Sequence, residues 1–389
     1  MDLTIWLWLF IAGVAGVFYT YIGYPIFLIV TARLLKRKVK KEYTTPSVSF
    51  LIVAHNEDWV IRKKLRNTLG LNYPAEKMEI VVASDGSDDK TENVVKEFSR
   101  RGVRLISYKK RIGKTPVINR TIPQLNGEIV VFSDSREMFH QDAVKELVAN
   151  FTNPKVGAVS GELILTDRKK EAVGKSIRLY WEYEKRLRKR EGEISSSVGA
   201  TGAIYAIRRN LFKPIPKVTI LDDLAIPMVI IAQGYRVIFD RTAKAYDDVS
   251  GNSRQEYGRK SRTMAGNFQI LFNLGRKYHF KNLFVLFEYF SHKVSRVLLP
   301  GFFTLVFISS LMVPFLWIRV FFICQAAFYG LALIGLLTER LGKKGLFIFH
   351  FPAVFCTLHF AIVVGFFRYA LHRQSHKWES MVRGKHRPE

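Results

Sequence analysis

The fold is decided by one stretch near the start of the chain, residues 51–92, which reads LIVAHNEDWVIRKKLRNTLGLNYPAEKMEIVVASDGSDDKTE. The stretch starts inside an apolar run, Val48–Ala54, continues with a helical pattern over Trp59–Leu69, and then reaches a second apolar run, Glu79–Ser84. Nearly continuous apolar strands that alternate with helices are typical of a mostly parallel sheet covered on both faces. We therefore expect an α/β domain.

The alternation of strands and helices continues beyond this stretch. Further strands are expected at Val103–Ser107 and Glu128–Ser133, and further helices at Thr91–Arg101, Thr115–Leu125 and Ala143–Phe151. In sheets of this kind, ligands bind at the carboxyl ends of the strands. The residues that directly follow each strand are therefore the candidates for a functional site.

Polar and acidic residues follow three of the predicted strands. They are His55-Asn56-Glu57, Asp85-Gly86-Ser87-Asp88-Asp89 and Asp134-Ser135-Arg136. One such segment alone is more often a turn with a helix cap, but three at the same edge of a sheet predict one polar cleft. The chain has no GxGxxG motif and no P-loop motif, which argues against a dinucleotide or P-loop site. A diphosphate beside carboxylates requires a divalent metal or basic residues, and Lys114 is well placed for the second role.

Composition and charge narrow the class of protein. Of the 389 residues, 48% are apolar, and the net charge at pH 7 is +27. The apolar content excludes a disordered chain, and two cysteines exclude a disulfide scaffold. Much of the positive charge flanks apolar segments, where retention at a membrane explains it, so we expect no nucleic-acid partner. The basic run Lys185–Arg190 is expected to be a solvated or lipid-facing face of a helix.

The apolar segments predict membrane helices. Leu3–Ala32 has no charged residue and is longer than the ~20 residues that one crossing needs. It is too long for a signal peptide, and the basic residues from Arg33 to Lys41 place its end in the cytoplasm by the positive-inside rule. Three further candidate crossings are Val297–Trp317, Val320–Leu337 and Leu346–Phe367, the first two forming a hairpin separated by Arg319.

Two parts of the C-terminal third depart from simple crossings. Phe268–Leu299 mixes apolar residues with lysines and arginines, which favours amphipathic helices on the membrane surface over packing helices of the soluble domain. A full crossing by Leu346–Phe367 would leave a basic tail, 368–389, outside. Because Pro352 favours a break in that segment, we expect that it does not cross fully and that the tail is cytoplasmic.

Five further motifs follow the opening stretch. They are GKTPVINR (113–120), GEIVVFSDS (127–135), VGATGAIYAIRR (198–209), ILDDLAIPMVIIAQGYRV (220–237) and EYGRKSRTMAGNFQIL (256–271). Together with residues 51–92 they resemble the membrane-bound, processive-type glycosyltransferases of family 2, which include cellulose, hyaluronan and poly-N-acetylglucosamine synthases. The resemblance implies a catalytic domain with a GT-A fold, a mostly parallel nucleotide-sugar-binding sheet, inserted between transmembrane helices.

The resemblance implies a donor site at the strand ends. The residues that it assigns to binding of the nucleotide sugar are Asn56, Glu57, Asp85, Lys114, Asn119, Asp134 and Arg136. Asp85 would hold the uracil and ribose, while Lys114 and Asn119 would lie near the diphosphate. Asp134, as the first acid of a DxD motif, would hold Mg²⁺ or Mn²⁺. The second acid is replaced by Arg136, so either Asp134 holds the metal with fewer protein ligands or the guanidinium supplies part of the charge.

On the acceptor side, the resemblance implies a general base and a gating segment. Asp223, the last acid of Leu221-Asp222-Asp223, matches the final residue of the TED motif and would be the base. Its neighbour Asp222 either faces the cleft or caps the following helix. Glu256, Arg259 and Lys260 occupy the QxxRW position, where the tryptophan is absent, and this departure weakens the case for a processive polymer channel.

The implied activity is inverting transfer of a sugar from a UDP-linked donor to a growing glycan or cell-surface polysaccharide. The alternatives are a single-sugar transferase with a lipid-carried acceptor and an inactive partner subunit of a polysaccharide synthase. The acids Asp85, Asp134 and Asp223 speak against an inactive subunit. The expected partners are the donor, a glycan or lipid-linked acceptor, the lipid bilayer and an accessory synthase subunit.

The sequence also predicts how the chain is divided. The expected parts are a transmembrane helix with its basic flank (1–41), a cytoplasmic GT-A domain (42–253), interfacial helices (254–299), transmembrane or re-entrant segments (297–367) and a basic tail (368–389). The protein is expected in the plasma membrane with its catalytic domain in the cytoplasm.

Overall fold

The structure is a computed structural model that describes residues 2–37, 39–166, 172–248, 253–274, 276, 280, 282–341 and 346–377. The chain divides into two units. The helical unit comprises Met1–Arg37, Leu165–Ser195 and Asp248–Gln374, and the sheet unit comprises Lys38–Ile164, Ser196–Asp247 and Ser375–Glu389. Most of the predicted basic tail, residues 378–389, lies outside the described residues.

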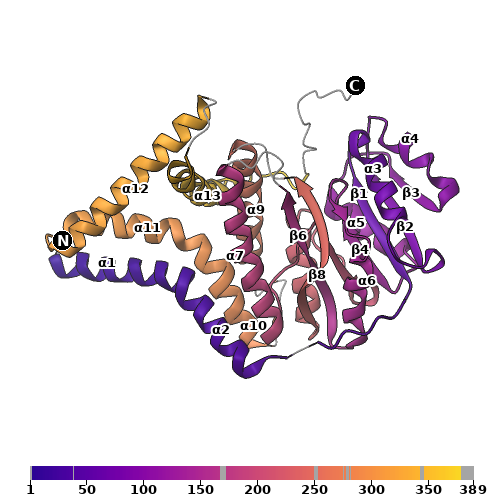
Figure 1. Ribbon diagram of the computed structural model, residues 1–389, viewed down its shortest axis with the longest axis horizontal. Coiled ribbons are helices and arrows are strands. Elements are labelled where there is room, and N and C mark those ends of the chain that lie inside the picture. The colour runs from indigo at the N-terminus through magenta and orange to yellow at the C-terminus, as the bar shows by residue number, and fades with distance from the viewer. Residues whose placement is uncertain are drawn as a thin grey trace. The chain divides into compact units, whose positions relative to one another are not determined.

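The sheet unit is built on a mixed sheet (Figure 1). Within the described residues its eight strands lie in the order β3-β2-β1-β4-β7-β6-β8-β5. Their bounds are β1 Val48–Ala54, β2 Met78–Asp85, β3 Val103–Tyr108, β4 Ile129–Ser133, β5 Met138–Phe139, β6 Val156–Thr166, β7 Tyr205–Arg208 and β8 Arg236–Asp248. Strands β3, β2, β1 and β4 pair in parallel, whereas β7 pairs antiparallel with both β4 and β6. The α/β prediction is confirmed, and half of the sheet is the parallel array that the apolar runs indicated.

Short helices connect the strands of the sheet unit. They are α3 Asp58–Leu69, η2 Ala75–Lys77, α4 Thr91–Lys96, η3 Ser99–Arg101, α5 Lys114–Thr121, η4 Ile122–Gln124, α6 Ala143–Val148, η5 Ala149–Thr152, η6 Arg209–Leu211 and α8 Asp222–Ala232. Every residue of β1 is buried, as expected for a strand covered on both faces. The core around it includes Ile61, Leu65 and Val144 from the covering helices. This core holds the ends of β1, β2 and β4 at one edge, where the candidate site lies.

The helical unit contains long apolar helices. Its elements are α1 Leu3–Phe18, η1 Tyr19–Gly23, α2 Tyr24–Leu35, α7 Ala172–Ile194, α9 Ser253–Asn273, α10 Leu283–Tyr289, η7 Phe290–Val294, α11 Ser295–Met312, α12 Leu316–Arg340 and α13 Phe347–Ala370. Helices α1 and α11 run side by side (Figure 1), and a Cβ atom on Gly13 would lie 2.8 Å from a methyl group of Val306. The absence of a side chain at Gly13 therefore permits this close helix contact.

Four stretches in the described residues are long and apolar enough to cross a membrane. They are Leu3–Leu35, Leu283–Met312, Leu316–Arg340 and Phe347–Ala370. The second starts earlier than the sequence predicted, because α10, η7 and α11 follow one another without a break. Arg319, expected to separate two helices, lies inside α12, and Pro352, expected to break the last segment, lies inside a continuous α13. The turn between α11 and α12 falls at residues 313–315 instead.

Phe268–Leu299 looks amphipathic in the sequence, and the structure shows where some of its charged and polar residues lie. Its charged residues do not all lie on one outer face, since Arg296 forms an ion pair with Glu184 of α7 and is mostly buried. His292 is also buried, between Glu184 and Glu191 of the same helix. Helix α7 itself, predicted to be part of the 42–253 domain, belongs to the helical unit. Polar groups in this apolar segment therefore bind carboxylates of α7 inside the helical unit.

Candidate active site

The end of strand β2 fixes a loop that leads into α5. Asp85 is fully buried, and its carboxylate accepts hydrogen bonds from the backbone N–H groups of Ile112 (2.6 Å) and Gly113 (2.9 Å). Gly113 has φ +99°, in the left-handed region that a glycine adopts without strain. The next residue, Lys114, starts α5. Asp85 therefore orients the loop that presents Lys114, and its predicted contact with the nucleoside remains a prediction.

The residues after β1 face the turn that follows β2. The side-chain amide of Asn56 donates to Asp88 Oδ1 (2.6 Å), and its oxygen accepts from the Asp88 N–H (3.0 Å). Glu57 is buried, and its Oε2 atom has no hydrogen-bond partner among the described residues. Burial raises the pKa of Glu57 to about 7, with Arg136 opposing the shift and Asp134 adding to it. The predicted cleft therefore contains a carboxyl group that is easily protonated.

Lys114 brings together acids from two separate parts of the chain. Its ammonium lies 2.8 Å from Oδ1 of Asp134, which follows β4, and 3.4 Å from Oδ2 of Asp222, the first residue of α8. Burial would lower the pKa of Lys114, but Asp134, Asp222 and Asp223 raise it above its ordinary value. Partial burial opposes ionisation of Asp134, whose side chain keeps 39% of its surface exposed, yet Lys114 holds the pKa of Asp134 below its ordinary value. The charged forms of this ion pair are thus stabilised by each other.

Asp222 and Asp223 point to different partners, as neighbours on a helix do. Helix α8 starts at Asp222 and has Leu221 as its N-cap residue, so the alternative that Asp222 caps the helix is wrong. The Asp223 carboxylate accepts from the Gly202 N–H (3.1 Å), and its carbonyl accepts from the Ala200 N–H (2.8 Å). The VGATG turn thus holds the predicted base in place.

Two other predicted donor residues have structural contacts. The side-chain amide of Asn119 donates to the Ile215 carbonyl (2.7 Å), and its oxygen accepts from the Ile215 N–H (3.1 Å). Asn119 therefore orients the segment before α8. The Arg136 guanidinium lies 3.9 Å from a Glu137 carboxylate oxygen and keeps 23% of its side-chain surface exposed. A partly exposed guanidinium beside Asp134 is suited to an anionic ligand.

Three buried polar residues at this edge were not predicted. They are Lys64 on α3, Glu137 after β4 and Tyr205 on β7. Burial lowers the pKa of Lys64 to about 7 and, with the negative charges of Asp134 and Asp247, raises that of Glu137 to about 8. The Tyr205 ring stacks on Phe132 at 4.3 Å between centroids, and burial raises the pKa of its hydroxyl, with Asp222 adding to the shift. One signal was available for Lys64, because it lies on the apolar face of its helix with Ile61 and Leu65.

The predicted gating residues lie on α9 in the helical unit. The Lys260 ammonium donates to the Tyr180 hydroxyl (2.5 Å) and lies 4.5 Å from the centre of that ring. Tyr180 in turn donates to Glu184 (2.9 Å). Arg259 lies on the same helix, and the side chain of Glu256 is outside the described residues. The contacts of Lys260 therefore connect α9 to α7.

A metal site at this edge would depend on Asp134. No group of three His, Cys, Asp or Glu side chains that could hold a metal occurs among the described residues. The Asp134 side chain is 39% exposed, and Lys114 contacts its Oδ1 atom, so a cation could approach the other oxygen past the residues that the structure describes. A divalent ion would then take its remaining ligands from the donor diphosphate and from water. The residues fit a metal held by one carboxylate.

Comparison with known proteins identifies relatives of the chain. The family model described as glycosyltransferase like family 2 matches residues 46–260. A probable glycosyltransferase, YdaM of Bacillus subtilis, is 26% identical over 267 residues, covering 63% of this chain and 61% of that protein. A beta-monoglucosyldiacylglycerol synthase of Trichormus variabilis is 31% identical over 163 residues, covering 41% of this chain and 34% of that protein. The chain thus spans less than two thirds of the length of these relatives.

A solved structure shares the fold over nearly the whole chain. It is the mannosyltransferase PcManGT of Pyrobaculum calidifontis in complex with GDP-mannose and Mn²⁺. The TM-score is 0.70 at 19% sequence identity, and the match covers 94% of this chain and 99% of that one. The match therefore includes residues of both the sheet unit and the helical unit, and it supports the GT-A prediction.

Proposed function

Because this chain belongs to glycosyltransferase like family 2, we propose that it transfers a sugar from a nucleotide-linked donor to an acceptor at a membrane. The observation that carries the proposal is the cluster of Lys114, Asp134 and Asp222 at the carboxyl edge of the sheet, with Asp223 beside it. These residues come from three elements, as expected of a ligand site in an α/β sheet. The cluster provides one cation, Lys114, for a diphosphate and a carboxylate, Asp223, for a proton.

The donor would bind through its diphosphate. Lys114 and Arg136 provide the positive charge that the leaving nucleoside diphosphate needs as its negative charge grows. A divalent ion on Asp134 would supply further charge neutralisation. We propose a UDP-linked donor on the basis of the sequence motifs, and GDP is the competing nucleotide because PcManGT was solved with GDP-mannose.

Asp223 would act as the general base. An acceptor hydroxyl attacks the anomeric carbon, its proton passes to the Asp223 carboxylate, and the bond to the diphosphate oxygen breaks with inversion. The backbone N–H of Gly202 donates to one carboxylate oxygen of Asp223 at 3.1 Å, which fixes the orientation of the carboxylate. A positioned base of this kind contributes about 10²–10⁴-fold to the rate.

The acceptor is proposed to be a growing glycan of the cell surface. Among the relatives, poly-beta-1,6-N-acetyl-D-glucosamine synthase of Staphylococcus epidermidis is 32% identical over 126 residues. A single transfer to a lipid-carried acceptor is the second candidate. The QxxRW position favours it, since the tryptophan is absent and Lys260 is engaged with Tyr180. An accessory synthase subunit and residence in the plasma membrane, with the sheet unit in the cytoplasm, belong to the same proposal.

The test is a screen of nucleotide sugars with the detergent-solubilised full chain. Release of nucleoside diphosphate is measured for UDP- and GDP-linked sugars, with and without Mn²⁺. We expect one donor to be hydrolysed or transferred, and Asp223→Asn to remove that activity. If no donor is turned over by wild type with glycan and lipid acceptors present, the proposal fails and an inactive partner subunit is the better description.

A further inference from the structure

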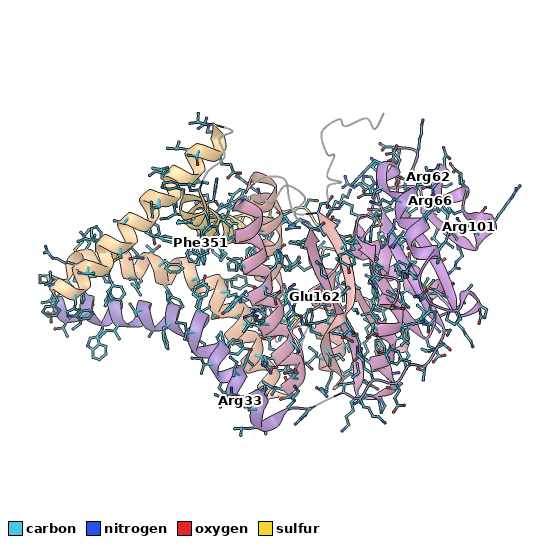
Figure 2. The ribbon with its side chains drawn as sticks, in the orientation of Figure 1. Arg33, Arg62, Arg66, Arg101, Glu162 and Phe351 are labelled. Carbon is cyan, nitrogen blue, oxygen red and sulfur yellow. The ribbon has the colours of Figure 1, made fainter. Side chains whose placement is uncertain are left out.

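Helix α3 carries one lysine whose surroundings differ from those of its other basic residues. Arg62 and Arg66 of α3 point outward (Figure 2), whereas the Lys64 side chain is completely buried. Its ammonium donates to the Ser133 hydroxyl (2.7 Å) and to the Glu137 carbonyl (2.6 Å). The Phe139 ring lies beneath it, with the ring centre 4.3 Å away. A buried ammonium is costly unless hydrogen bonds and charges compensate it, and here two oxygens and an aromatic ring do so.

The two oxygens bound by Lys64 lie at the two ends of one loop. Ser133 is the last residue of β4, and Glu137 comes four positions later. Between them are Asp134 and Arg136, the residues that the proposed function assigns to the metal and the diphosphate. The Ser133 hydroxyl also donates to the Asp134 carbonyl (3.0 Å), which continues the contact into the loop. One ammonium group therefore joins both ends of the donor-site loop.

Other buried side chains of the loop do not make this connection. Ser135 Oγ and Glu137 Oε2 are buried and have no hydrogen-bond partner among the described residues. The backbone of the loop is thus held by Lys64 and by the Ser133 hydroxyl that Lys64 binds, and not by Ser135 Oγ or Glu137 Oε2. Asp134, which pairs with Lys114, and Arg136 both keep part of their side chains exposed to a ligand on this loop.

We propose that Lys64 is a positioning residue for donor binding, which sets the distance between Asp134 and Arg136 and the bound diphosphate without touching it. The inference rests on the proposed function, because it takes the Ser133–Glu137 loop to be the diphosphate side of the donor site. It predicts that Lys64 matters for the phosphates and not for the nucleoside. If Lys64 served only the stability of α3, its loss would weaken binding of the diphosphate and of the nucleoside to the same extent.

The test compares Lys64→Met with the control Lys63→Met in the full chain in detergent. Methionine keeps an unbranched apolar stem and removes the ammonium, while Lys63 is exposed on the same helix. Calorimetry measures the affinity for UDP and GDP and for uridine and guanosine, all in the presence of Mn²⁺. For the nucleotide that wild type binds, we expect Lys64→Met to weaken binding of the diphosphate about 10- to 100-fold, the range for hydrogen bonds to a charged group. Binding of the matching nucleoside should change less than about 2-fold.

A second variant keeps the inference testable if Lys64→Met does not fold. Ser133→Ala removes one of the two acceptors and leaves Lys64 on the Glu137 carbonyl, so we expect a smaller loss, about 3- to 10-fold, again for the diphosphate alone. An unchanged ratio of diphosphate to nucleoside affinity in the folded variants would overturn the inference. If wild type binds neither nucleotide, both the proposed function and the inference that rests on it fail. If wild type binds but both ligands are weakened equally, only the inference fails.

Discussion

Glu57 provides a quantitative prediction, because its carboxyl group is buried with one unpartnered oxygen. Burial raises the pKa of Glu57 to about 7 from 4.5. A proton is therefore held more tightly in the folded chain than in the unfolded chain. Below pH 4.5 both states are protonated and no cost arises. As the pH rises from 4.5 to 7 the unfolded state loses its proton first, so the stability falls, and above about 7 the full cost is present.

The size of this cost follows from the difference between the two pKa values. At ~1.4 kcal/mol per pH unit, the step from 4.5 to about 7 corresponds to about 3 kcal/mol. Glutamine has nearly the same shape and is neutral at every pH. Glu57→Gln should therefore remove about 3 kcal/mol of destabilisation at pH 8 and leave the stability at pH 4.5 unchanged. For a domain of this size, that difference raises the unfolding midpoint by roughly 6–12 °C.

Thermal unfolding of the full chain in detergent, followed by tryptophan fluorescence between pH 4.5 and 8, measures this effect. The pKa of Glu137 is also raised by burial, so Glu137 lowers the stability with rising pH in wild type and in the variant alike. The difference between their unfolding midpoints therefore reports on Glu57. Glu76→Gln, at an exposed carboxylate of the sheet unit, is the control. Equal midpoints of wild type and Glu57→Gln at pH 8, or a lower midpoint for the variant, would refute the reasoning.

Further predictions concern catalysis, the metal and the tail. Asp223→Asn should keep nucleotide binding and lower transfer by about 10²–10⁴-fold, and transfer above a tenth of wild type would exclude Asp223 as the base. Asp134→Ala should weaken nucleotide binding in calorimetry with Mn²⁺ more than without it; an equal loss in both would make Arg136 the counter-charge. A cysteine at Ser375, in a background without the two native cysteines, should resist a membrane-impermeant thiol reagent in intact cells and react after lysis. Labelling of intact cells would place the tail outside.

The strand ends were predictable because their signal is local. The apolar run Val48–Ala54 is strand β1 with the same bounds, and Glu79–Ser84 lies inside β2. Once these strands pair in parallel, their ends must meet at one edge, so the loops carrying Asp85 and Asp134 were expected there. The antiparallel half of the sheet was not predicted, since β6, β7 and β8 pair with partners that no short window of sequence identifies.

The partners of individual side chains could not be predicted from local patterns. The amide of Asn119 binds Ile215, which lies 96 positions away, and Lys64 binds Ser133 and Glu137, about 70 positions away. The motifs identified Asn119 as a donor-site residue without indicating that its amide is occupied by backbone. Similarly, Arg296 is one of the charges that made Phe268–Leu299 look amphipathic, and its partner Glu184 lies on another helix. Such pairs form only when distant segments of the chain pack together, so local patterns in the sequence do not identify the partners.

The path of the chain limits how the C-terminal helices can lie in a bilayer. The chain leaves the sheet unit after β8 and returns to it at Ser375, five residues after α13 ends. Within the sheet unit, a Cβ atom on Gly113 would lie 2.9 Å from the His376 ring, so this segment contacts the loop held by Asp85. A folded α/β unit lies on one side of a membrane. We therefore propose that the three apolar helices between its two connections cross an even number of times.

Three full crossings are odd and would leave Ser375 on the wrong side. We propose that α13 is the helix that does not cross. It packs tightly on α9, where a Cβ atom on Gly365 would lie 2.5 Å from Met264 Cβ, and its buried side chains include His350 and Pro352. Helix α9 also carries Arg259 and Lys260, so α13 would lie at the interface against the helix assigned to the acceptor side. Because α13 continues through Pro352, the reason for the predicted topology is no longer a broken segment but an intact helix packed on α9. In this proposal the tail stays on the side of the membrane where the sheet unit lies.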